Sequence, residues 1–360
     1  MNFLKKDSLY SIGLLGIPLV LFSLGLVVLS SASQSFIGEN YFLKQILAFF
    51  LAVFFGTLAF FLNWEYLRRW SLLFLICSFA LLLIVFIPGV GLKINGARRW
   101  FSLGLFNVQI SEMAKLALVF FLADYFDKRQ RQLSDLRVSF FIPMGIVAAF
   151  CGVVFVEPDF GTAFLLGLTG FSMIFIMGIP WRYLIGTIGL GGGVFVLGVY
   201  LDPIRFNRIL AFLDVEGNKF TTSYQLWQSF LGFAAGGPWG VGLGNGRQQL
   251  HFLPEAHTDF IFPILSEELG GWIALIVVVL FAIFFLIGII RLFRPKLFYF
   301  LFGFGLLLMM TFQALINFAV VTGIVPTKGM ALPFISYGGS NLMSVCIALG
   351  ILLSILKHAR

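Results

Sequence analysis

Runs of about 17 to 25 apolar residues recur along almost the whole of this 360-residue chain, and each can cross a hydrocarbon core of roughly 30 Å as a helix. Backbone polar groups cannot be left unsatisfied in lipid, and these runs are too long and too evenly apolar for barrel strands. The sequence therefore predicts an all-α integral membrane protein. The ten predicted spans cover residues 11–30, 44–62, 71–88, 109–125, 138–156, 160–179, 183–201, 268–290, 297–322 and 341–357.

Composition excludes a soluble protein, because 60% hydrophobic and 11% charged residues cannot provide a solvated surface around a core. The first apolar run follows Lys5 and Lys6 and resembles a secretory signal. Its length exceeds that of a typical signal core, so we interpret it as a retained first span. We detect no linker, soluble domain or internal repeat and expect residues 1–360 to form a single polytopic membrane domain.

The distribution of Lys and Arg predicts the orientation, because short cytoplasmic loops are enriched in them. With the N-terminus inside, the inner segments hold fourteen of these residues, and the short outer loops hold five: Lys44, Lys93, Arg98, Arg99 and Lys328. Both termini are therefore expected in the cytoplasm. A long loop at about 202–267, between the seventh and eighth spans, is expected on the extracytoplasmic side. The net charge of +8 reflects this bias and attraction to anionic lipid, and we expect no nucleic-acid partner.

Three titratable side chains, Glu255, His257 and Asp259, stand together just before a hydrophobic segment. Charge kept at a membrane boundary indicates a functional site. Pro254 directly precedes them, which favours a held segment facing the membrane surface rather than a simple connecting loop. An alternative is a metal site formed by His251 and His257 with the two acids, although their spacing is not that of a zinc site.

A glycine-punctuated outer segment, residues 95–104, carries Arg98 and Arg99 beside Trp100. Cations in a short outer loop run against the orientation rule and require an explanation. The planar guanidinium of Arg engages two phosphate oxygens together, so we predict an anionic ligand here. The alternative is a surface loop whose arginines pair with local acids.

Two further charged clusters flank predicted spans. Glu112 and Lys115 are three residues apart and fall on one helical face, within pairing reach. They form either a structural ion pair or a site in which Lys115 is held toward an outer cavity to meet an anionic substrate. Glu157, Asp159 and Gly161 belong to a tight outer turn, which we interpret first as a rigid turn and second as part of a site.

Two segments are rich in glycine or proline. Residues 236–246 permit tight turns and close backbone approach, but they match no phosphate-binding or dinucleotide pattern; residues 224–228 upstream could form an interfacial helix. Asn317 precedes residues 322–340, where prolines and glycines rule out one continuous helix. We predict a re-entrant or surface loop there, with Lys328 exposed to an outer cavity.

Together these motifs resemble the SEDS (RodA/FtsW) family of cell-wall polymerases, and the resemblance covers nearly the whole chain. Its motifs occupy residues 95–100, 111–115, 157–162, 253–270 and 326–340, in family order. The resemblance implies an enzyme that joins lipid II units into glycan strands outside the cytoplasmic membrane. It also implies a class B penicillin-binding protein as partner, together with other membrane proteins of the division or elongation machinery.

By this resemblance, Asp259 matches the acid on which polymerase activity depends. The positions expected to line the outer cavity and bind substrate are Arg99, Glu112, Lys115, Asp159, Lys328, Lys44, Glu255 and His257. The chain departs from the family pattern by having Lys44 before Gln45 instead of Arg, and Ile110 before Ser111 instead of Pro. Residues 95–100, 157–161 and 208–214 are more similar to the division branch, FtsW, than to the elongation branch, RodA.

The expected reaction is glycosyl transfer with inversion, because the lipid-linked sugar is α and the polymer is β. Asp259 is the candidate base for the incoming 4-hydroxyl, and Arg99, Lys115 and Lys328 are candidates for the pyrophosphate leaving group. A divalent cation, Mg²⁺ or Mn²⁺, could assist, in which case Asp259 could be its ligand instead. We expect no other cofactor.

Two other classes of function remain open at this stage. A transporter that flips the same lipid would also need intramembrane charge and broken helices. A scaffold that only docks other division proteins would tolerate replacement of Asp259 by Asn. The crowding of charge on the predicted outer face favours the enzyme.

Overall fold

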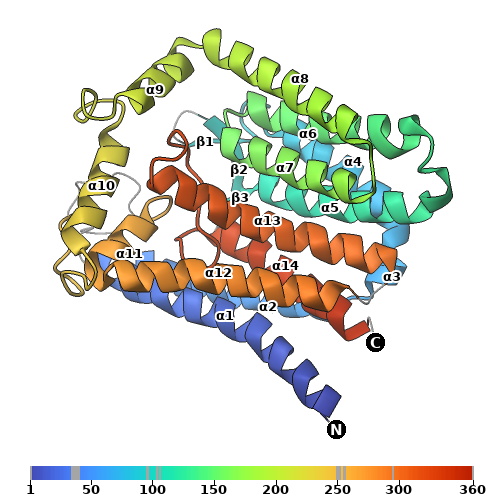
Figure 1. Cartoon of the computed structure of the whole chain (residues 1–360), viewed down its shortest axis with the longest axis horizontal. Helices are drawn as coiled ribbons and strands as arrows, with labels where there is room; N and C mark the ends of the chain where they lie inside the picture. Colours follow the sequence, from blue (N-terminus) through green and yellow to red (C-terminus); the bar gives the residue numbers. More distant parts are fainter. Residues whose placement is uncertain are drawn as a thin grey trace.

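A computed structural model describes residues 2–33, 41–94, 97–102, 104, 107–248, 253, 257–293 and 296–358. Within these residues the protein is a bundle of helices lying roughly along one direction (Figure 1). The first half contains α1 (Asn2–Ser33), α2 (Tyr41–Phe61), α3 (Trp64–Leu67), α4 (Ser71–Ile84), α5 (Ile110–Lys128), α6 (Ile142–Val156) and α7 (Phe160–Ile176). The second half contains α8 (Trp181–Tyr200), α9 (Pro203–Leu213), α10 (Tyr224–Gly236), α11 (Ile261–Leu269), α12 (Gly271–Leu292), α13 (Leu297–Val321) and α14 (Gly339–His358).

The described residues include eight helical segments long and apolar enough to cross a membrane, which confirms a multi-pass helical membrane protein. Two predicted spans, 109–125 and 160–179, are helical but fall outside these eight. Helix α5 carries five charged residues, and α7 has only 17 residues. Both nevertheless lie inside the bundle beside α13 (Figure 1). The predicted total of ten spans stays a prediction.

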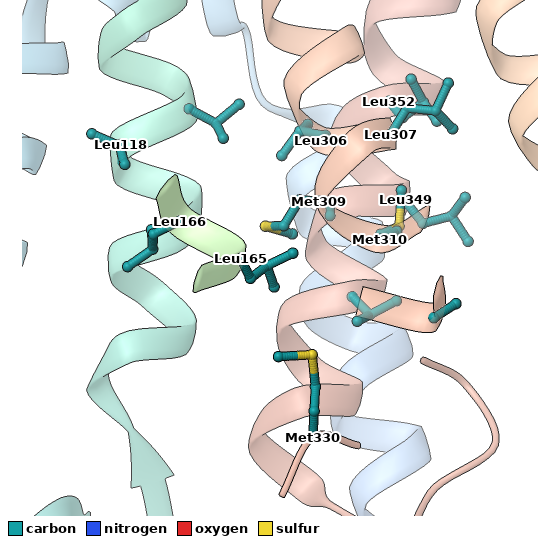
Figure 2. Packing of buried hydrophobic residues seen from close by; sticks show 14 of the residues in the cluster. Leu118, Leu165, Leu166, Leu306, Leu307, Met309, Met310, Met330, Leu349 and Leu352 are labelled. Carbon is teal, nitrogen blue, oxygen red and sulfur yellow. The ribbon is translucent and has the colours of Figure 1, made fainter. Parts of the chain in front are cut away.

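The core of the bundle is built on α13 and α14, whose apolar windows are 67% and 72% buried, whereas that of α8 is only 6% buried. Figure 2 shows Met309 and Met310 of α13 between Leu165 and Leu166 on one side and Leu349 on the other. Unbranched methionine fills irregular gaps between helices. Of the eight candidate spans, α13 and α14 are therefore the most buried, and residues 322–338 join them.

Helices α2 and α14 are in backbone contact. A Cβ at Gly56 would lie 2.7 Å from the carbonyl oxygen of Cys346, and a Cβ at Gly350 would collide with the carbonyl oxygen of Gly56. Small residues allow such close approach and favour helix association in membranes, where the hydrophobic effect does not drive it. The two helices are consequently fixed side by side along their middle.

The predicted loop at 95–104 is partly wrong, because its described residues include a strand within the otherwise helical fold. Strands β1 (Leu92–Ile94), β2 (Ala97–Ser102) and β3 (Asn107–Gln109) form a three-stranded antiparallel sheet in the order β1-β2-β3. Lys93 pairs with Arg98, and Trp100 pairs with Gln109. The ladder satisfies backbone groups that a loop would have to expose. The sheet leads directly into α5.

The predicted long loop at 202–267 contains helices. It contains α9, α10 and α11, and α10 extends the predicted interfacial helix at 224–228 to thirteen residues. The predicted eighth span began at residue 268, but α11 ends at Leu269 and α12 begins at Gly271. Gly270 between them has a φ of 93°, a backbone conformation that favours glycine and breaks the helix.

The ends of α1 and α14 that carry the chain termini lie at the same end of the bundle, called here the terminal end (Figure 1). The opposite end carries the sheet, α9, α10 and α11, and is called the site end (Figure 1). Having both termini at one end agrees with an even number of crossings.

Candidate functional site

The segment between α13 and α14, residues 322–338, is called the α13–α14 loop. Several elements of the site end contact it. Gln45 of α2 donates to the carbonyl oxygen of Ser336 (3.2 Å) and accepts from the N–H of Gly338 (3.3 Å). Ser340, just beyond the loop, donates to the carbonyl of Asn107 (2.6 Å). The loop is thereby tied to α2 and β3, elements far apart in sequence.

Asp259 lies in the turn before α11, against this loop. Its carbonyl oxygen accepts a hydrogen bond from Nδ2 of Asn317 (2.8 Å), which also donates to the carbonyl of Met330 (2.7 Å). A Cβ added to Gly329 would lie 2.5 Å from Oδ2 of Asp259. The carboxylate is therefore packed against the loop backbone at a position that has no side chain.

His257 contacts the start of α2 in the same region. Its ring stacks on Tyr41 with centroids 4.4 Å apart and lies 5.5 Å from the ring of Tyr337. The N–H of Tyr337 donates to the carbonyl of His257 (2.9 Å). Lys44 is exposed, and its Nζ lies 5.7 Å from the centroid of Tyr41. The structure thus groups Lys44, His257 and Asp259 around one loop.

Lys328 joins this group from the loop itself, one residue before Gly329. Its Nζ lies 5.2 Å from the centroid of Phe160, the first residue of α7. A Cβ at Gly161 would lie 2.9 Å from Cε of Met330 and 3.4 Å from the carbonyl oxygen of Gly329. The start of α7 therefore forms another wall of the site.

The turn before α7 is held by its own side chains, as the rigid-turn interpretation predicted. Asp159 caps α7 by accepting from the N–H of Thr162 (3.1 Å), and its other oxygen accepts from Nε2 of Gln109 (3.0 Å). Arg99 donates to the carbonyls of Glu157 (2.8 Å) and Pro158 (2.9 Å). Arg99 therefore pairs with main-chain oxygens, and not with the local acids of the alternative interpretation.

Glu157 is the unusual acid of this turn. It is 1% exposed, and its Oε1 has no hydrogen-bond partner among the described residues. Burial, aided by the charge of Asp159 and opposed by that of Arg99, raises the pKa of Glu157 to about 8. Desolvation disfavours the charged form of a carboxyl, so Glu157 holds its proton at neutral pH.

Glu112 and Lys115 form the structural ion pair that the spacing allowed, with Nζ 2.8 Å from Oε1. Lys115 is only 2% exposed and also donates to Oε1 of Gln313 (3.1 Å). The expectation that Lys115 faces an outer cavity is wrong, because its ammonium is enclosed between α5 and α13. A charge buried in this way is retained when it is paired and hydrogen-bonded.

Sequence reasoning missed a pair of buried acids, Glu267 and Glu268, at the end of α11. Each is 1% exposed. Glu267 accepts from the N–H groups of Arg247 (2.9 Å) and Gln248 (3.1 Å), and Glu268 accepts from the N–H of Gly244 (3.0 Å). The glycine-rich run thus wraps carboxylates. Two adjacent glutamates just before a long apolar helix were the signal available in the sequence.

The metal hypothesis receives no support from the described side chains. Among them, no group of three or more His, Cys, Asp and Glu side chains is arranged to hold a metal ion. Glu255 and His251, two of the predicted site residues and ligands, lie outside the described residues.

A multi-pass helical membrane protein with acids and cations gathered around a broken segment at one end is the class that this fold and site define. Residues 12–360 match the family FTSW_RODA_SPOVE, described as cell cycle protein. The chain therefore belongs to this family, and the predicted resemblance is confirmed.

Individual relatives agree with this assignment. The chain is 39% identical over 341 residues to the "Probable peptidoglycan glycosyltransferase FtsW" of Saccharophagus degradans, covering 91% of this chain and 87% of that protein. It is 37% identical to "Stage V sporulation protein E" of Bacillus subtilis, with 96% of each chain covered.

Solved structures extend the similarity to three dimensions. A chain from work on "polymerization and crosslinking by a peptidoglycan synthase complex" superposes with a TM-score of 0.82 at 28% identity, covering 96% of this chain and 97% of that chain. "Rod shape determining protein RodA" of Thermus thermophilus superposes with a TM-score of 0.71 at 26% identity, covering 96% of each chain.

Proposed function

We propose that this protein is a peptidoglycan glycosyltransferase that polymerises lipid II into glycan strands. The observation that carries the proposal is similarity over nearly the full length to relatives named peptidoglycan glycosyltransferase, up to 39% identical. The arrangement of Asp259, Lys328 and Lys44 around one loop supports the same reaction.

In the proposed reaction, the 4-hydroxyl of the acceptor sugar attacks the anomeric carbon of the donor. A carbon–oxygen bond forms there as the bond to the pyrophosphate oxygen breaks, and the configuration inverts. Asp259 takes the hydroxyl proton, because a base is needed as the oxygen attacks. The departing undecaprenyl pyrophosphate carries negative charge, which nearby cations stabilise.

The contacts of the predicted cations narrow this assignment. Two donors of Arg99 are engaged by main-chain carbonyls, and Lys115 is buried in an ion pair. Lys328 and Lys44 are the cations that we assign to the pyrophosphate. A divalent cation, Mg²⁺ or Mn²⁺, stays a prediction, because two of its predicted ligands, His251 and Glu255, lie outside the described residues.

The setting of the reaction is part of the proposal. We place the site end outside the cytoplasmic membrane and both termini in the cytoplasm, because Lys and Arg are concentrated in the loops of the terminal end. A class B penicillin-binding protein that crosslinks the product is the proposed partner, which the similarity to a synthase complex supports. The FtsW-named relatives favour a role in division over elongation.

The test is polymerisation of purified lipid II by the reconstituted protein with its penicillin-binding partner, resolved as glycan ladders on a gel. We expect ladders from wild type and from Asp135→Asn, an exposed control in the segment that joins α5 and α6. We expect none from Asp259→Asn, because a missing base costs roughly 100- to 10,000-fold in rate.

Two outcomes would contradict the proposal. Ladders from Asp259→Asn, in a preparation free of other polymerases, would remove Asp259 from the chemistry. Ladders from none of the proteins, despite a folded complex, would favour a lipid flippase, which should then move labelled lipid II across vesicle membranes, or a scaffold, which should do neither.

A further inference from the structure

Helix α13 presents two buried amide side chains to the α13–α14 loop. Gln313 and Asn317 lie four residues apart, on one face of the helix, and are 2% and 1% exposed. Gln313 Nε2 donates to the carbonyl of Ala331 (2.8 Å), and Asn317 Nδ2 donates to that of Met330 (2.7 Å). Two consecutive carbonyls of the loop are therefore held by successive turns of one helix.

Asn317 also reaches the turn that carries Asp259. The same Nδ2 donates to the carbonyl of Asp259 (2.8 Å), and an amide NH₂ has two hydrogens, so both bonds form together. Its Oδ1 is buried with no hydrogen-bond partner among the described residues. Leaving an acceptor unsatisfied costs free energy, which indicates that the two donations are what this side chain provides.

Gly329 constrains the position of the Asp259 side chain, and Asn317 constrains the position of the Asp259 backbone. A Cβ at position 329 would lie 2.5 Å from Oδ2 and 3.5 Å from Cγ of Asp259. The loop also passes close to the start of α7, where a Cβ built on Gly161 would lie 3.4 Å from the carbonyl oxygen of Gly329. The carboxylate therefore rests against bare loop backbone, at a position that has no side chain.

Helix α13, which carries Gln313 and Asn317, is itself anchored to neighbouring side chains. Gln313 accepts from Nζ of Lys115 (3.1 Å), which is paired with Glu112 (2.8 Å), and it donates to Oδ1 of Asn341 (2.7 Å). Hydrogen bonds in such a buried network reinforce one another. The buried ion pair thus ends in Gln313, one of the two side chains that hold the loop.

We propose that Asn317 and Gly329 are positioning residues that fix the place and direction of the Asp259 carboxylate, with Gln313 holding the loop in register. This inference rests on the proposed function, in which Asp259 takes the proton of the acceptor hydroxyl. A base must lie within about 2.6–3.2 Å of that proton's oxygen. A misplacement of about 1 Å can cost roughly 100-fold in rate.

The test compares Gly329→Ala with Gly339→Ala in the reconstituted complex with its penicillin-binding partner, measuring kcat, KM for lipid II and the pH profile. A Cβ at Gly339 would only touch Cβ of Ala48 at 3.6 Å, an ordinary contact, so this variant is the matched control. We expect Gly329→Ala to lower kcat by roughly 10- to 100-fold with little change in KM.

The pH profile separates positioning from damage to the fold. The added methyl group excludes water from the carboxylate, which favours its neutral form, so the acidic limb of kcat should move to higher pH. A fraction of misfolded protein would lower kcat without moving that limb. Asn317→Ala tests the other contact and should also lower kcat at nearly constant KM.

The inference is overturned if folded Gly329→Ala and Asn317→Ala both match Gly339→Ala in kcat and in pH profile. It is also overturned if their loss appears in KM alone. Activity retained by Asp259→Asn would instead reject the proposed function, so the two failures are distinguishable.

Discussion

The two ends of the bundle hold their charged side chains in different ways. At the terminal end, Arg68 donates to Asp124 (2.9 Å) and Asp127 (2.5 Å) and pairs with Glu65 (3.2 Å), while Lys128 donates to Asp124 (2.6 Å). Opposite charges meet directly there, and each cancels much of the field of its neighbour.

At the site end, main-chain groups hold many of the charged side chains. Arg99 donates to two carbonyls, and Glu267 accepts from two N–H groups. A peptide group is a dipole without net charge, so it fixes a side chain while leaving its formal charge in place. Four ion pairs gather at the terminal end, whereas at the site end the buried Glu112–Lys115 pair accompanies charges that main-chain groups hold.

The largest stability effect is expected at the terminal end, from Arg68→Ala. The change leaves Asp124 and Asp127 without their guanidinium partner, and Asp124 is 3% exposed. Breaking a buried pair in this way costs about 3 kcal/mol. Thermal unfolding of the purified protein in detergent measures it, with exposed Arg131→Ala as control. Equal midpoints for the two variants would contradict direct pairing as the stabilising device.

A smaller, pH-dependent effect is expected at the site end from Glu157→Gln. The pKa of Glu157 is about 8 in the folded protein and about 4.3 in an unfolded chain. Between these values the unfolded chain releases a proton that the folded protein keeps, so wild-type stability falls as pH rises from about 4.3 to about 8. The variant should lack this slope, which for one proton is at most about 1.4 kcal/mol per pH unit.

Unfolding midpoints of wild type and Glu157→Gln, measured between about pH 5 and pH 8, check this expectation. The difference between the two proteins should shift steadily in favour of the variant as pH rises. A constant difference would mean that Glu157 is already ionised in the fold.

The smallest effect is expected from Arg99→Lys, which loses the fork that spans the carbonyls of Glu157 and Pro158. We expect a loss of about 1 kcal/mol of stability and an unchanged KM for lipid II. Arg98→Lys is the matched control, because Arg98 makes a single longer bond to the carbonyl of Phe86 (3.3 Å). A raised KM for lipid II at unchanged stability would indicate instead that Arg99 binds the substrate.

The spans were largely predictable because each depends on a local property, the length of an apolar run. Helix α13, predicted at 297–322, is observed at Leu297–Val321. The segments between the spans were less predictable. Hydropathy does not indicate the sheet β1-β2-β3, α9 or α11, because their residues are of mixed polarity. Their structure depends on partners brought from elsewhere in the chain.

The site illustrates the same limit. Asp259, Lys328 and His257 stood out because charge is rare in this sequence. The contacts that arrange them, such as Gln45 with Ser336 or Asn317 with Asp259, join residues far apart in the chain. Lys115 was misplaced for the same reason, because its partner Gln313 lies 198 residues away.

The glycine contact between α2 and α14 governs which parts of the site end can move. With Gly56 and Gly350 in backbone contact, one helix cannot slide or roll past the other without collision. Lys44 at the start of α2 and the loop that precedes α14 therefore travel as one body. A growing strand that has to advance past the site gains its room from other elements, and the thinly packed α8 is the first place to look for that movement.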